Sequence, residues 1–119
     1  MATILIVDDE KDIVDFFGRI LVREGFQILA TTSASEGLRL ADLEHPDLIL
    51  LDINMPEMDG GDVDQALQAN KGTMGIPVIF LSGLITKEEE GDVKGQLYIS
   101  KSSTKEEIIQ KIKDVLGMK

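Results

Sequence analysis

Residues 48–60 read LILLDINMPEMDG. Four consecutive apolar residues lead directly into a carboxylate, Asp52, and turn-forming residues follow at once. A continuous apolar run of this kind is typical of a strand that is buried on both faces, as in a parallel sheet. Ligands bind at the carboxyl edge of such sheets, so Asp52 is expected at the mouth of a crevice. The alternative is that Asp52 only begins a turn.

Short apolar runs alternate with helical patterns along the chain. Three helix starts have the spacing of a capping box, and Gly91 and Gly95 leave only a short fourth helix. Five strand–helix repeats predict one α/β domain over residues 1–119, with a parallel sheet, helices on both faces and right-handed crossovers. The expected strands are residues 3–7, 26–31, 48–52, 78–81 and 97–100; the expected helices begin near Asp12, Ala34, Gly60, Thr86 and Lys105.

Composition excludes several classes of function. The chain has no Cys and a single His, which excludes disulfides, thiolate catalysis and clustered imidazole metal sites. The net charge is −10, and residues 1–60 hold thirteen acidic but only four basic residues. This imbalance argues against direct binding to nucleic acid or to anionic membranes, and it favours a cation near the N-terminal half. The apolar runs are too short to span a membrane, and no signal-peptide pattern opens the chain, so a cytoplasmic location is expected.

Polar residues follow four of the five expected strands. Because parallel strands end at one edge, this edge should collect the side chains of Asp8, Asp9, Asp52, Ser82 and Lys101. Three neighbouring carboxylates repel one another, and a hard cation such as Mg²⁺ removes that repulsion. A metal, a hydroxyl and an ammonium together suit a phosphoryl group, and a carboxylate can act as its acceptor. There is no Walker-type glycine loop, so nucleotide binding is not supported.

These residues resemble a known family, the receiver domains of two-component response regulators. The resemblance covers essentially the whole chain and rests on five separated signals in the right order. It implies a flavodoxin-like, doubly wound (βα)5 fold with strand order 2-1-3-4-5. The signals are Asp8-Asp9, Asp52 with Met55-Pro56 and Asp59-Gly60, Ser82-Gly83, Tyr98 and Lys101.

The resemblance also implies roles for these residues. Asp52 would be the phosphoacceptor, and Lys101 and the Ser82 hydroxyl would bind the phosphoryl oxygens. Tyr98 matches the aromatic side chain that changes rotamer when the domain switches. Mg²⁺ would be held by Asp9, Asp52 and the backbone carbonyl of Asn54, with Asp8 acting largely through water.

The same family implies a signalling protein that catalyses only its own phosphorylation and slow hydrolysis. The phosphoryl donor would be a histidine of a sensor kinase or of a phosphotransfer protein. The output partner is not specified by the sequence. It would bind the face made by helix 4, strand 5 and helix 5, and a homodimer is left open.

Two features depart from the family pattern. Ser102 stands where the family usually has a proline in a cis bond, so the sequence leaves open whether the bond after Lys101 is cis or trans. The short fourth helix suggests an unusual partner or a weaker switch.

Three other functions stay open. The first is a degenerate receiver that binds partners without being phosphorylated. The second is a Mg²⁺-dependent phosphatase with an aspartate nucleophile, although Asn54 stands where such enzymes commonly have a second Asp. The third is a flavin-binding domain on the same sheet, which rests on fold analogy alone.

Overall fold

The structure, a computed structural model, describes residues 2–83, 91–93 and 96–117. Strands and helices alternate along most of the chain, as the sequence predicts. In chain order the elements are β1 (Thr3–Val7), α1 (Lys11–Arg23), β2 (Gln27–Thr31), α2 (Ala34–Glu44), β3 (Leu48–Asp52), α3 (Gly60–Ala69), β4 (Val78–Ser82), β5 (Gly91–Val93), β6 (Gln96–Ser100) and α4 (Lys105–Leu116).

The strands form one sheet in the order β2-β1-β3-β4-β6-β5. The first five strands of this order are mutually parallel, whereas β5 pairs antiparallel to β6 at the edge. The predicted five-stranded parallel sheet with order 2-1-3-4-5 is therefore confirmed, with β6 as its fifth strand. The additional strand β5 was not expected.

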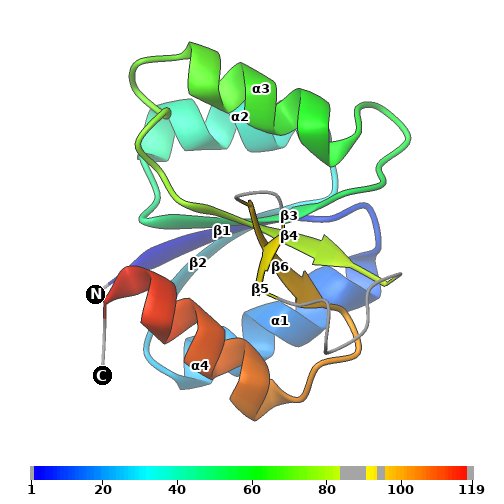
Figure 1. The fold of residues 1–119 in the computed structure, drawn as a ribbon, viewed down its shortest axis with the longest axis vertical. Coiled ribbons are helices and arrows are strands. Elements are labelled where there is room, and N and C mark those ends of the chain that lie inside the picture. Colours follow the sequence, from blue (N-terminus) through cyan, green and yellow to red (C-terminus); the bar gives the residue numbers. More distant parts are fainter. Residues whose placement is uncertain (1, 84–90, 94–95, 118–119) are drawn as a thin grey trace.

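Helices cover both faces of the sheet: α1 and α4 lie on one side, and α2 and α3 lie on the other (Figure 1). Alternate residues of β1 enter the two halves of the core, Ile4 and Ile6 on the α1–α4 side and Leu5 and Val7 on the α2–α3 side. Strand β3 lies between β1 and β4, and all five of its residues are buried. Its uninterrupted apolar sequence thus follows from its central position in the sheet.

Local signals in the sequence set several helix ends. The Ser33 hydroxyl accepts a hydrogen bond from the Glu36 N–H at 3.3 Å at the start of α2. Thr104 and Glu107 form a reciprocal capping box at the start of α4. Helix α1 stops before Gly25, which has a φ of 95° that favours glycine.

The segment between β4 and β6 differs from the expectation. The start of the short fourth helix, predicted at Thr86, lies outside the described residues. Gly91–Val93 do not continue a helix, because their backbone pairs with Gln96–Ser100 as strand β5. The bond between Lys101 and Ser102, which the sequence left open, is trans, and no cis bond occurs among the described residues.

The helical spacing of Ile13, Phe16, Phe17, Ile20 and Leu21 predicts one apolar stripe on α1, and one of these residues is not in the core. Phe16 is 38% exposed, whereas Phe17 and Leu21 are fully buried.

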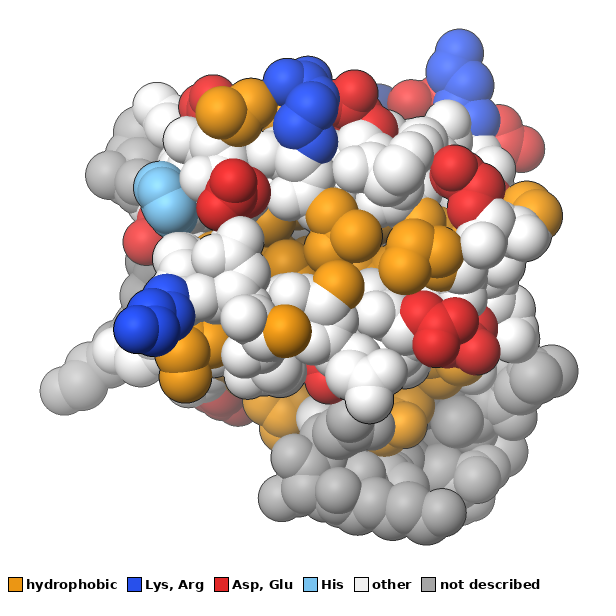
Figure 2. Space-filling model, turned by 90° about the horizontal axis from the view of Figure 1, so that it is seen from above, with side chains coloured by type: hydrophobic (Ala, Val, Ile, Leu, Met, Phe, Trp, Pro, Cys, Tyr) orange, Lys and Arg blue, Asp and Glu red, His pale blue; other side chains and the backbone are white. Residues whose placement is uncertain are grey.

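The opposite side of the molecule, over α2 and α3, has a mixed surface on which an apolar strip lies among acidic and basic side chains (Figure 2). No described helix combines the length and the apolar character that crossing a bilayer requires.

Candidate functional site

Strand β3 delivers Asp52 to the carboxyl edge of the sheet. The residue pairs with Leu81 of β4, and only 3% of its surface is exposed. The N–H of Asn54, in the turn that follows, donates to Asp52 Oδ1 at 3.3 Å. The carboxylate is therefore buried at the end of β3, where it accepts a hydrogen bond from the turn that follows.

The end of β1 brings two further carboxylates to this edge. Asp8 is fully buried, and Asp9 is exposed. The N–H of Glu10 donates to Asp8 Oδ1 at 2.9 Å, which closes a tight turn just before α1 begins. This turn faces the end of β3, because β1 and β3 are neighbouring parallel strands.

Lys101 follows β6 and reaches back across the edge of the sheet. Its backbone N–H donates to the Ser82 carbonyl at 2.9 Å, which ties the loop to the end of β4. Its ammonium nitrogen Nζ lies 2.9 Å from Asp8 Oδ2 and 3.2 Å from Asp52 Oδ1. The lysine side chain is 13% exposed, so both ion pairs are largely shielded from water.

Glu10 is a site residue that sequence reasoning missed. Its Oε1 atom lies 2.9 Å from Lys101 Nζ and accepts a hydrogen bond from it. The only signal in the sequence is that Glu10 directly follows two aspartates, and this does not distinguish a site residue from an acidic residue at a helix start.

These side chains surround an open pocket of about 290 Å³. The predicted residues Asp9, Asp52, Asn54, Ser82 and Lys101 all line it. Asp8 is not one of the lining residues and is buried against the lysine. Glu10 and Gly83 complete the lining of the pocket.

Tyr98 lies outside this pocket. It sits on β6 beside Phe80 of β4, and the two ring centroids are 5.4 Å apart. Ser82 follows Phe80 by two residues, so the hydroxyl and the aromatic pair lie on the same face of the sheet. Tyr98 is half-buried and packs against the core on the α2–α3 side.

The loop after β3 has a structural role. Asp59 caps α3 by accepting a hydrogen bond from the Asp62 N–H at 2.9 Å. The Gly60 N–H donates to the Ile53 carbonyl, and a Cβ added at Gly60 would lie 2.9 Å from the Asp52 carbonyl oxygen. Only glycine permits this close approach, which packs the start of α3 against the backbone of Asp52 and Ile53.

The electrostatics of the site oppose a charge on Asp52. Burial raises its pKa to about 7, with further contributions from a hydrogen bond with Asp9 and the negative charge of Asp8, and only Lys101 acts in the opposite direction. Burial lowers the pKa of Lys101, but hydrogen bonds to Glu10 and Asp8 outweigh it and raise the pKa above its ordinary value. The lysine is therefore charged at neutral pH, and the acidic cluster is short of positive charge.

The donor set fits a hard divalent cation. Oxygen atoms of Asp8, Asp9 and Glu10 all lie within 4.8 Å of one another. Among the described residues, the buried Asp8 Oδ2 is held only by the Lys101 ammonium, at 2.9 Å. Such an oxygen beside other carboxylates suits Mg²⁺, which combines carboxylate ligands with retained waters. Asp52 and the exposed Asn54 line the same pocket as Asp9 and Glu10.

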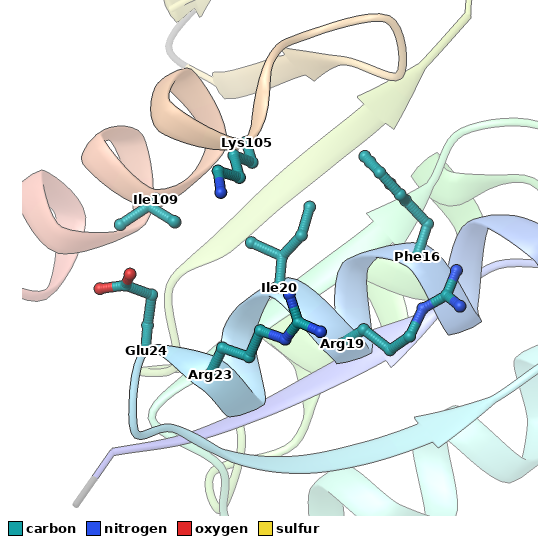
Figure 3. A pocket seen from close by; sticks show the side chains of 7 residues that line it. All are labelled: Phe16, Arg19, Ile20, Arg23, Glu24, Lys105 and Ile109. Atoms are coloured by element: carbon teal, nitrogen blue, oxygen red, sulfur yellow. The ribbon is translucent and has the colours of Figure 1, made fainter.

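A larger hollow lies elsewhere, in a groove of about 350 Å³ between α1 and α4 (Figure 3). Phe16, Ile20 and Ile109 are its apolar residues, and Arg19 and Arg23 supply positive charge beside them. The groove is also lined by Lys105 and by Glu24, which is paired with Lys113 at 3.2 Å. It contains none of the converging strand-end residues, which line the smaller acidic pocket.

Comparison with known proteins agrees with this geometry. Residues 4–113 match the family described as the response regulator receiver domain. The polar-differentiation response regulator DivK of Brucella ovis is 33% identical over 97% of this chain and 96% of its own length. PhoP of Bacillus subtilis, an alkaline phosphatase synthesis transcriptional regulatory protein, is 32% identical, but the chain spans only 48% of it.

Solved structures show the same relationship. A response regulator from Desulfuromonas acetoxidans superposes with a TM-score of 0.84 at 32% identity and covers 98% of both chains. The chemotaxis protein CheY4 of Vibrio cholerae gives a TM-score of 0.85 at 25% identity, with 97% of this chain and 98% of CheY4 covered. The chain belongs to the response regulator receiver domain family.

Proposed function

We propose that this receiver domain is switched by phosphorylation of Asp52. The observation that carries the proposal is the buried Asp52 carboxylate, which lies 3.2 Å from Lys101 Nζ at the mouth of an acidic pocket. The phosphoryl donor would be a phosphohistidine on a sensor kinase or on a phosphotransfer protein. A small acyl phosphate can replace it in a test.

In the transfer, a carboxylate oxygen of Asp52 attacks phosphorus and the bond between phosphorus and the donor breaks. The donor leaves with the electron pair, so that acetyl phosphate would release acetate. Lys101 would stabilise charge on the phosphoryl oxygens, and the Ser82 hydroxyl at the end of β4 would donate to one of them. Burial of Asp52 restricts water around the product, which suits a slowly hydrolysed acyl phosphate.

Mg²⁺ bound here would neutralise negative charge on both the acidic cluster and the incoming phosphoryl group. We propose Asp9, Asp52 and the Asn54 carbonyl as its direct ligands, with Asp8 holding it through water. Lys101 alone balances little of the charge of Asp8, Asp9, Glu10 and Asp52 (all near the pocket). A bound cation would therefore favour the approach of an anionic donor.

The signal would pass from Ser82 to the face that includes β6 and α4. A phosphoryl charge of about −2 at Asp52 would attract the Ser82 hydroxyl. Movement at the end of β4 would change the space beside Tyr98, whose ring packs on Phe80 of the same strand. Phosphorylation would shift the populations of two conformations, and an output partner would bind one of them better.

The test is the intact mass of the protein after incubation with acetyl phosphate, with and without Mg²⁺. The wild type should gain one phosphoryl group only with the metal, and hydroxylamine should remove it. Asp52→Ala should gain none. A wild type that gains no mass from acetyl phosphate or from phosphorylated histidine donors would support the degenerate receiver, whereas sustained turnover of phosphate esters would support the phosphatase.

A further inference from the structure

The ammonium group of Lys101 is fully engaged by carboxylates in the resting protein. Its Nζ atom lies 2.9 Å from Asp8 Oδ2, 2.9 Å from Glu10 Oε1 and 3.2 Å from Asp52 Oδ1. An ammonium has three N–H donors and no more. A phosphoryl group that arrives at Asp52 must therefore compete with a carboxylate for this lysine.

The three carboxylates differ in their freedom to leave. The side chains of Asp8 and Asp52 are 0% and 4% exposed, whereas that of Glu10 is 59% exposed. Asp8 and Asp52 also accept backbone hydrogen bonds from the turns that follow their strands. The carboxylate of Glu10 can move into water at little cost, because water replaces the lost contact.

Only the side chain of Glu10 needs to move. Its carbonyl accepts hydrogen bonds from the N–H groups of Ile13 and Val14, and its own N–H is bound to Asp8. Although Glu10 stands at the N-cap of α1, its side chain makes no capping hydrogen bond. The carboxylate is thus committed to the lysine and not to the helix.

We propose that Glu10 is a positioning residue, a clamp that holds Lys101 in the resting state and releases it when Asp52 is phosphorylated. The inference rests on the proposed function. The added charge of about −2 at Asp52 outcompetes the exposed carboxylate for the ammonium. Glu10 therefore sets how readily the protein takes up the phosphoryl group, without touching that group itself.

Removing the clamp should favour the phosphorylated conformation. Glu10→Gln should bind beryllofluoride, an analogue of the phosphoryl group, about two- to fivefold more tightly, as expected for loss of a competing exposed ion pair. With acetyl phosphate, the maximal rate should rise by a similar factor. The Lys101 ammonium signal in the NMR spectrum of the resting protein should shift in this variant.

Two variants separate a clamp from a mere change of charge. Glu10→Asp keeps the charge but shortens the side chain, so it should behave like Glu10→Gln. Asp12→Asn removes the same charge from the exposed first turn of α1, and no described contact joins Asp12 to the lysine. Because Glu10 also lies near the proposed metal ligands, Mg²⁺ is titrated for each variant and used at saturation.

The outcomes distinguish this inference from the proposed function. Equal beryllofluoride affinities for Glu10→Gln and Asp12→Asn would overturn the clamp. Wild-type behaviour of Glu10→Asp would show that only charge matters and would overturn it as well. If the wild type bound neither beryllofluoride nor a phosphoryl group, the proposed function itself would fail and the clamp with it.

Discussion

Lys101 Nζ lies 3.2 Å from Asp52 Oδ1, although Asp52 ends β3 and Lys101 follows β6, two strands that are separated in the sheet by β4. The contact exists because parallel strands end at a common edge, and the hydrogen bond from the Lys101 N–H to the Ser82 carbonyl directs the loop toward that edge. The consequence is a cation held against the carboxylate that we propose as phosphoacceptor.

Removal of this cation should destabilise the resting protein. Lys101→Met leaves Asp8 and Asp52 buried without their counter-charge, and we expect a loss of about 2–3 kcal/mol in the free energy of unfolding. Urea denaturation at pH 7.5 measures it. Lys113→Met removes a partly exposed ion pair with Glu24, at the C-terminal end of α1. This loss should lower the free energy of unfolding by less than about 1 kcal/mol. Equal losses would contradict the special position of Lys101.

The raised pKa of Asp52 makes stability depend on pH in a defined direction. A pKa of about 7 in the folded state lies above the ordinary value of 3.8, so the group stabilises the fold at low pH. That stabilisation is lost as the pH rises through about 7. In EDTA, Asp52→Asn should therefore be more stable than the wild type at pH 8, by roughly 2 kcal/mol.

Thermal unfolding across this pH range checks the expectation. The difference between Asp52→Asn and the wild type should shrink toward pH 5, where the native carboxylate also becomes neutral. Saturating Mg²⁺ should reduce it at pH 8, since a bound cation favours the ionised carboxylate. A difference in stability that does not vary with pH would contradict a raised pKa of Asp52 in the folded protein.

The close approach of Gly60 to the backbone at the end of β3 predicts a steric effect of any larger side chain at this position. A Cβ at Gly60 would lie 2.9 Å from both the Asp52 carbonyl oxygen and the Ile53 Cα, which are backbone atoms that cannot rotate away. Gly60→Ala should cost about 2–3 kcal/mol of stability. Gly75→Ala is the matched control, because nothing lies within 4 Å of its added Cβ, and its effect should stay within about 0.5 kcal/mol. Similar costs for both variants would refute the argument.

Much of the fold followed from local pattern. The apolar run of β3 required burial on both faces, and capping residues such as Thr104 marked helix starts that the structure confirms. Strand β5 could not be anticipated, because glycine and aspartate have low strand propensity and the strand exists only through its pairing with β6. Its formation depends on a tertiary contact that a sequence pattern does not contain.

The acidic pocket was accessible from the sequence for a simple reason: strand ends in a parallel sheet share an edge. That rule placed Asp9, Asp52 and Lys101 together. It could not reveal the contact between Glu10 and Lys101, which depends on side-chain direction in the turn before α1. It also could not show that Phe16 points into the α1–α4 groove, because helical spacing does not say which edge of an apolar stripe is covered.

In the proposed switch Asp52, and no other carboxylate of the pocket, carries the phosphoryl group. The most direct test is reduction of the acetyl phosphate-treated protein with borohydride, which converts an aspartyl phosphate to homoserine, followed by peptide mass spectrometry. We predict homoserine at position 52 only, and only when Mg²⁺ was present. Homoserine at position 8 or 9, or none at position 52 in a protein that gained the phosphoryl mass, would contradict the account.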